Sequence, residues 1–154
     1  MATNWSTPPP RTLKLNTDGV AKGKPRLAGN EGVIRDHHGF IRETFSENIG
    51  IQDSNFVKFY AIREGISLFF SSPWVTTHSV VVENDSANAI NWVQHHCKVL
   101  WRMKNTSNSI ETFLRRSTRF TFKQIMREAN NIADGLAKAG VLRDSNFKAY
   151  FQNQ

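Results

Sequence analysis

A chain of 154 residues, 39% of them hydrophobic, is long enough to form one domain with a full core. Its single cysteine, Cys97, excludes an internal disulfide framework, and its apolar runs fall far short of the roughly 20 residues that span a bilayer. The formal net charge of +7 favours an anionic partner. No basic segment followed by an apolar run opens the chain, so we expect an intracellular protein of the nucleus or cytoplasm, neither secreted nor membrane-bound.

The first half of the chain predicts an arm, three strands and a helix. Residues 1–11 are rich in proline and predict a flexible arm before a domain over residues 12–143. Alternation from Leu13 predicts a strand that ends in a turn at Gly19, and residues 20–31 predict a loop. Two strand-like runs around His38 and Gly39 predict a hairpin, and residues 55–71 predict a helix.

The second half predicts a strand over residues 78–85 and helices over residues 86–96 and 107–117. Asp85 or Ser86 is placed to cap the first of these helices. A strand over residues 119–126 and a helix over residues 129–141, ending at Gly140, complete the domain, and residues 144–154 predict a loosely held tail. This order of elements is typical of an α/β fold in which helices pack on the faces of a mixed sheet.

Positive charge is concentrated in one part of the chain. From Lys98 to Arg127 there are eight Lys and Arg residues and a single acid, Glu111. Such a region is either a solvated basic face or a surface that contacts the phosphate backbone of a nucleic acid.

The helix predicted over residues 55–71 carries Lys58 on its apolar side, together with Ala61, Ile62 and Ile66. A bare ammonium group on a buried face is costly unless a negative group meets it. The sequence therefore indicates a carboxylate partner for Lys58.

Three aspartates follow strands or begin helices: Asp18, Asp85 and Asp134. Each has an ordinary interpretation, as a turn residue, a helix cap and a first-turn acid respectively. Carboxylates at such positions can also converge across one edge of a sheet.

Six segments resemble the ribonuclease H domains of plant retroelement reverse transcriptases, in order and in spacing. They are LKLNTDGVAKGKP, AGNEGVIRDHHG, FSENIG, FYAIREGI, VVVENDSANAI and REANNIADGLAKAG, and they run from about Leu13 to about Val141. The resemblance implies a ribonuclease H-like fold, with a five-stranded mixed sheet whose first three strands are antiparallel and which is flanked by helices. It also implies a chain derived from a plant retrotransposon.

The resemblance implies cleavage of the RNA strand of RNA/DNA hybrids by two magnesium ions, held by a carboxylate cluster that would include Asp18, Asp85 and Asp134 as catalytic residues and metal ligands. The family's glutamate maps onto Lys58 and its histidine onto Gln124. Nucleic-acid contacts are expected from the first loop, the start of the first helix and the basic region, at the following residues: Lys24, Asn55, Arg102, Lys104, Arg115 and Arg116.

Lys58 is expected to compete with magnesium for the carboxylates, since an ammonium group takes the same space and carries the same sign of charge. In the alternative, its long side chain passes the site into solvent and leaves the aspartates weakly competent. Glu31, in the segment GNEG, is a further candidate to pair with Lys58 or to replace part of the lost ligand.

Three functions stay open at this point. The first is a nucleic-acid-binding ribonuclease H-like domain whose catalysis is impaired or lost, a pseudoenzyme. The second is an active magnesium-dependent ribonuclease that tolerates Lys58. The third is a domesticated fragment that serves as a protein-interaction module with a protein partner.

Overall fold

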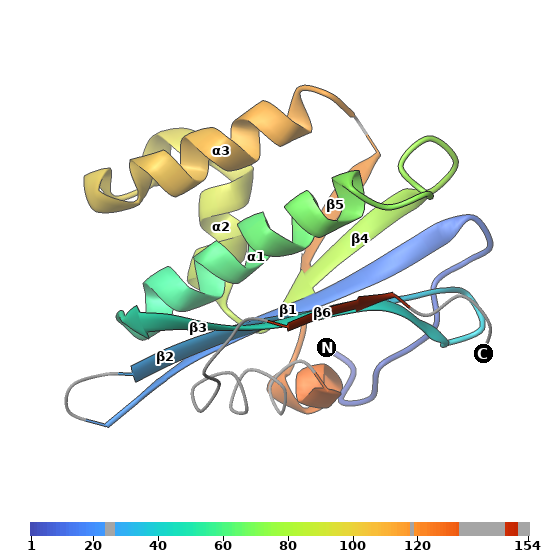
Figure 1. Ribbon diagram of the computed structural model, residues 1–154, viewed down its shortest axis with the longest axis horizontal. Helices are drawn as coiled ribbons and strands as arrows, with labels where there is room; N and C mark the ends of the chain where they lie inside the picture. The colour runs from blue at the N-terminus through green and yellow to red at the C-terminus, as the bar shows by residue number, and fades with distance from the viewer. Residues whose placement is uncertain (24–26, 118, 133–146, 151–154) are drawn as a thin grey trace.

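The computed structural model describes residues 1–23, 27–117, 119–132 and 147–150. Its centre is a six-stranded sheet in the order β5-β4-β1-β2-β3-β6 (Figure 1). The strands are β1 Thr12–Lys22, β2 Leu27–Arg35, β3 Ile41–Ile51, β4 Ser79–Asn84, β5 Phe120–Gln124 and β6 Phe147–Tyr150. β1, β2 and β3 pair antiparallel, and β4 and β5 add in parallel on the other side of β1.

The first five strands confirm the mixed sheet expected from the sequence, and the hairpin turns around Gly39 as predicted. The expectation of a loose tail from residue 144 needs a correction. Phe147–Tyr150 forms β6, which pairs antiparallel with β3 from Ser46 to Glu43. The edge of β3 offers unpaired backbone groups, and a short segment of alternating residues can satisfy them although its sequence signal is weak.

The helices α1 Ser54–Phe70, α2 Ala87–Gln94 and α3 Lys104–Leu114 lie on one side of the sheet (Figure 1). Short 3₁₀ turns η1 His96–Lys98 and η2 Trp101–Met103 connect α2 to α3, and η3 Arg127–Asn130 lies on the opposite side of the sheet. The helix predicted over residues 129–141 lies mostly outside the described residues. None of the described helices has the length and apolarity that crossing a bilayer requires.

The main core forms where α1 packs on the sheet, and it includes Leu15, Ile62, Ile66 and Phe69. The prediction of a turn at Gly19 is wrong: β1 continues to Lys22 and the turn lies at Gly23, which has a positive φ of 81°. A Cβ atom on Gly19 would lie 2.2 Å from Cγ1 of Val57 and 2.7 Å from its backbone carbon. Gly19 is therefore a close-approach position within a strand, which lets α1 cross β1.

The N-terminal arm packs against the sheet at Trp5. The guanidinium group of Arg35 lies 3.7 Å from the centre of the Trp5 ring, and Nζ of Lys14 donates to the carbonyl oxygen of Ser6 at 2.8 Å. The arm, predicted to be flexible, thus has specific contacts with β1 and β2.

Candidate functional site

The first turns of α1 carry Lys58 to the end of β4. α1 begins after Asp53, whose Oδ1 accepts the backbone N–H of Phe56 at 2.9 Å as an N-cap. Nδ2 of Asn84 donates to the carbonyl oxygen of Lys58 at 3.3 Å and to Oγ1 of Thr17 at 3.0 Å. This amide ties the helix, β4 and β1 together beside the site.

Asp18 lies on the face of β1 that points away from α1. Leu15 and Thr17 contact α1 at Gly65, and Gly19 contacts it at Val57, so alternation along the strand turns Asp18 to the opposite face. β4 pairs with β1 only as far as Asn16. Beyond that point no strand of the described residues pairs with this edge of β1, and Lys58 reaches Asp18 across it.

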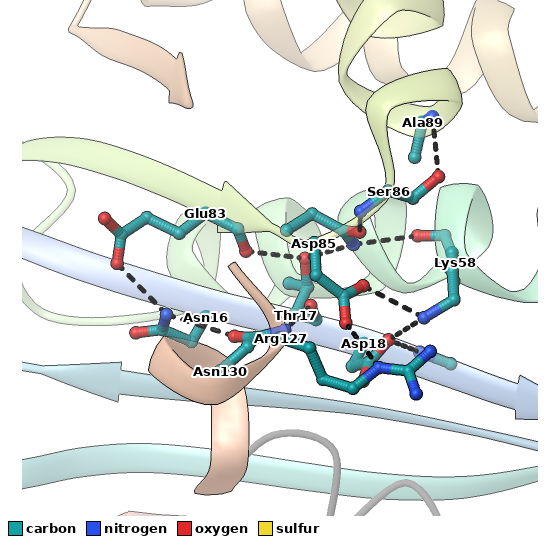
Figure 2. A network of polar contacts seen from close by, with 12 residues as sticks. Asn16, Thr17, Asp18, Lys58, Glu83, Asp85, Ser86, Ala89, Arg127 and Asn130 are labelled. Carbon is teal, nitrogen blue, oxygen red and sulfur yellow. Dashed lines mark hydrogen bonds and ion pairs between the residues drawn. The ribbon is translucent and has the colours of Figure 1, made fainter. Parts of the chain in front are cut away.

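The ammonium group of Lys58 lies between two carboxylates (Figure 2). Its Nζ donates to Oδ1 of Asp18 at 2.5 Å and to Oδ1 of Asp85 at 3.0 Å. The Lys58 side chain is 18% exposed, whereas the side chains of Asp18 and Asp85 are 0% and 7% exposed. The two ion pairs are therefore largely shielded from water. Charge-assisted hydrogen bonds are strong in such a shielded environment.

Asp85 is available to Lys58 because its neighbour caps α2. Oγ of Ser86 accepts the backbone N–H of Ala89 at 3.1 Å, which decides between the two caps that the sequence allowed. Nε of Arg127 lies 3.9 Å from the second oxygen of Asp85, Oδ2, as a more distant counter-charge.

The pKa of Asp18 is raised to about 6 in total, because burial and the nearby Asp85 carboxylate raise it by more than Lys58 and the backbone N–H of Gly19 lower it. Burial would lower the pKa of Lys58, but the Asp18 and Asp85 carboxylates outweigh it and raise the pKa above its ordinary value. Lys58 is consequently charged at neutral pH.

A buried hydrogen-bond network next to the site fixes η3 on the sheet (Figure 2). Nδ2 of Asn16 donates to Oε1 of Glu83 at 3.0 Å and to Oδ1 of Asn130 at 3.2 Å. Nδ2 of Asn130 in turn donates to the carbonyl oxygen of Thr17 at 3.0 Å. These contacts position the segment that carries Arg127 beside Asp85.

An open groove of about 440 Å³ adjoins the ion pairs. Asn55, Lys58, Asp85 and Gln124 line it, and so does Arg127. The structure thus brings four residues that the sequence singled out into one place, and it adds Arg127, whose only sequence signal was its place in the basic region. Asp134 and Lys24 lie outside the described residues.

The other predicted nucleic-acid contacts lie elsewhere. Arg102 lies at η2, where its Nη1 pairs with Oδ2 of Asp53 at 2.6 Å, and Nζ of Lys104 donates to the carbonyl oxygen of His96 at 3.2 Å. Arg102 therefore lies beside the N-cap of α1. Arg115 and Arg116 follow the end of α3 and line a different groove.

Glu31 lies directly across from Asp18 in the ladder of β1 and β2, so both side chains lie on the same face. Glu31 is fully buried, and its Oε1 accepts a hydrogen bond from Oγ1 of Thr44 at 2.8 Å. Its suggested role as a partner of Lys58 or as a metal ligand stays a prediction.

The described site does not match the donor set of a magnesium ion while Lys58 is in this position. Magnesium takes oxygen ligands in octahedral geometry, but one oxygen of each carboxylate already accepts a hydrogen bond from the ammonium group. Across the part of the chain that the structure describes, no group of three or more His, Cys, Asp or Glu residues is placed to hold a metal ion.

A family model described as "Reverse transcriptase-like" matches residues 16–140. An Arabidopsis thaliana protein named "Putative ribonuclease H protein At1g65750" is 28% identical over 133 residues, which are 86% of this chain and 21% of that protein. The chain therefore spans about a fifth of the length of this relative.

Comparison with solved structures agrees with the fold. The structure of LC11-RNase H1, isolated from compost by a metagenomic approach, superimposes with a TM-score of 0.77 at 27% identity, over 85% of this chain and 96% of that one. The same enzyme in complex with an RNA/DNA hybrid gives a TM-score of 0.75 at 26% identity, over 84% and 96% of the two chains.

Proposed function

Because this chain belongs to the reverse transcriptase-like family of ribonuclease H-like domains, we propose that it binds RNA/DNA hybrids and that Lys58 makes its hydrolytic activity weak or absent. Lys58 stands at the position of the family's glutamate in this proposal. The observation that carries it is the pair of contacts from one ammonium group to Asp18 and Asp85, at 2.5 and 3.0 Å.

The physical basis of the proposal is competition between two cations. Ribonucleases H generally use divalent metal ions, which bind to carboxylates. Lys58 would have to leave both aspartates before a metal ion could bind, and each charge-assisted hydrogen bond is worth about 1.5–3 kcal/mol. If it stayed, repulsion between the ammonium group and the ion would amount to several kcal/mol, since unit charges about 4 Å apart interact by about 4 kcal/mol at an effective dielectric constant of about 20.

Hybrid binding is supported by the charge and by the groove. The chain carries a formal charge of +7, and the groove beside Lys58 is lined by Asn55, Gln124 and Arg127. Arg102 lies beside the start of α1, where it pairs with Asp53. LC11-RNase H1, which shares the fold, has been crystallised in complex with an RNA/DNA hybrid.

The deciding experiment compares the natural chain with Lys58→Glu and Lys58→Gln on a labelled RNA/DNA hybrid, in magnesium and then in manganese. We expect salt-sensitive binding by the natural chain with little or no cleavage, and cleavage by Lys58→Glu. Lys58→Gln is the matched control, because it removes the ammonium group without restoring a carboxylate. Efficient cleavage by the natural chain that Asp18→Asn abolishes would contradict the proposed loss of activity.

An active magnesium-dependent ribonuclease is the second candidate, and one observation favours it. The Lys58 side chain, 18% exposed, is more exposed than the two carboxylates that it contacts, and it borders an open groove of about 440 Å³. Its flexible side chain could turn into that groove when a hybrid and metal ions arrive. In that case Asp18 and Asp85, with Asp134 from outside the described residues, would hold the magnesium ions, and activity would rise steeply with metal concentration.

A further inference from the structure

A second basic groove lies at the far end of α1, away from Lys58. It forms where α1 ends, where α3 leads into β5 and where the loop before β4 turns back (Figure 1). The groove has a volume of about 620 Å³ and is lined by Phe70, Val75, Thr76, Arg115, Arg116, Ser117 and Arg119. We call it the distal groove. Phe70 lies twelve residues beyond Lys58 on the helix, which at 1.5 Å per residue is about 18 Å.

Two of the three arginines in the distal groove are held in place by neutral groups. The guanidinium group of Arg116 lies 4.6 Å from the centre of the Phe70 ring, and Phe113 stacks on Phe70 with 5.3 Å between ring centres. Nη1 of Arg119 donates to the carbonyl oxygen of Thr76 at 2.8 Å. The planar donor groups are therefore partly ordered before any ligand binds, which lowers the entropy cost of binding.

These arginines have no carboxylate partner among the described residues. Arg115, Arg116 and Arg119 are all exposed, and within the described part of the chain none of them forms an ion pair. The acid closest in sequence is Glu111, one helical turn before Arg115, and the described lining of the groove includes no Asp or Glu. The positive potential of the distal groove is thus left for an external anion.

The basic surface continues beyond this groove. An adjoining groove of about 540 Å³ shares Thr76 and Arg119 with it and adds Arg11 and His78 to its lining. Burial lowers the pKa of His78, and the neighbouring charge of Arg11 lowers it further. The three arginines of the distal groove and Arg11 therefore follow one surface from β5 to the start of β1. Such a surface suits an extended polyanion better than a single small anion.

We propose that the distal groove is a second nucleic-acid contact, which binds the phosphodiester backbone through Arg115, Arg116 and Arg119 at a distance from the Lys58 site. The inference rests on the proposed function, because it takes nucleic acid as the polyanion that this domain binds. Planar guanidinium groups suit the bidentate recognition of phosphate oxygens. A separation of about 18 Å corresponds to about five steps of a duplex strand, each about 3.4 Å long.

The test measures binding of a fluorescein-labelled 18-base-pair RNA/DNA hybrid at several salt concentrations. We compare the natural chain with the single variants Arg115→Gln, Arg116→Gln and Arg119→Gln and with the triple variant. Lys148→Gln is the control for each single variant, because it removes one exposed charge from β6 at the opposite edge of the sheet. Far-UV circular dichroism and melting temperature show whether each variant remains folded.

Each arginine that contacts a phosphate should reduce the slope of log K against log salt concentration by about 0.9. We expect the triple variant to reduce the slope by about 2 to 3 and to weaken binding at least tenfold at low salt, while Lys148→Gln leaves both unchanged. Unchanged slope and affinity in the triple variant, with normal hybrid binding by the natural chain, would refute the distal contact alone. Failure of the natural chain to bind the hybrid would refute the proposed function and this inference together.

Discussion

The replacement Lys58→Met tests directly whether the ammonium group acts as the built-in counter-ion of the carboxylates. Methionine keeps much of the length and apolar character of the side chain and removes the charge. Lys58 donates two charge-assisted hydrogen bonds, to Asp18 and Asp85. Breaking a buried ion pair by removing one partner costs about 3–5 kcal/mol. Since the Lys58 side chain is 18% exposed, we expect the lower end of that range, about 3 kcal/mol at pH 8.

The cost should depend on pH in a defined direction. The pKa of Asp18 is about 6 in the folded protein against an ordinary value of 3.8, and Lys58 acts to lower it. Its raised pKa means that stability is lost as pH rises from about 3.8 through the folded-state value. Without Lys58 the pKa of Asp18 in the folded protein rises further, so stability continues to fall at higher pH. The variant should therefore be less than half as destabilised at pH 5 as at pH 8, as measured by urea unfolding.

Magnesium provides an independent readout that does not require activity. The variant presents Asp18 and Asp85 without a competing ammonium group, and a ligand present at ten times its Kd stabilises by about 1.4 kcal/mol. Magnesium at ten or more times its Kd for the variant should raise the free energy of unfolding of Lys58→Met and leave that of the natural chain unchanged. Asp18→Asn in the Lys58→Met background is the control, and it should abolish the gain.

Two results would refute this reasoning. One is equal stability of Lys58→Met and the natural chain at both pH 5 and pH 8, which would mean that the ion pairs contribute nothing. The other is equal stabilisation of both proteins by magnesium, which would mean that Lys58 does not compete with the metal ion.

Three further variants test other parts of the structure. Glu43 is fully buried, neither of its carboxylate oxygens has a hydrogen-bond partner among the described residues, and burial raises its pKa to about 8. From about pH 4.5 to above pH 8 the free energy of unfolding of the natural chain should therefore fall by about 3–5 kcal/mol more than that of Glu43→Gln, measured by urea titration at each pH. Gly19→Ala should cost more than about 3 kcal/mol or prevent folding, because its Cβ would lie 2.2 Å from Val57, and Val57→Ala in the same chain should relieve only part of this since backbone atoms also lie within 2.8 Å. Ser86→Ala should cost about 1 kcal/mol in thermal unfolding through loss of the α2 cap, whereas Ser86→Asp should cost little.

Local sequence patterns were sufficient to predict most of the secondary structure and to indicate that Lys58 needs a negatively charged partner. Alternation and apolar spacing predicted the hairpin around Gly39 and the helix that carries Lys58, because these signals depend on neighbours within a few residues. These patterns failed at Gly19. A glycine at such a position usually marks a turn, but here it lies within β1 and leaves room for Val57 of α1. They also failed at Phe147–Tyr150, which becomes a strand because β3 offers a free edge.

The sequence by itself determined that Lys58 would lie on the wrong side of its helix and would need a negative partner, since helical geometry fixes which residues share a face. Only the tertiary structure decided how that partner is reached. β4 stops pairing with β1 at Asn16, and this opens the edge through which Lys58 meets Asp18 and Asp85. Tertiary structure likewise divided the basic region, placing Arg127 beside Lys58 and three other arginines in the distal groove at the far end of α1. Such placements arise from contacts between residues far apart in sequence, and no local pattern contains them.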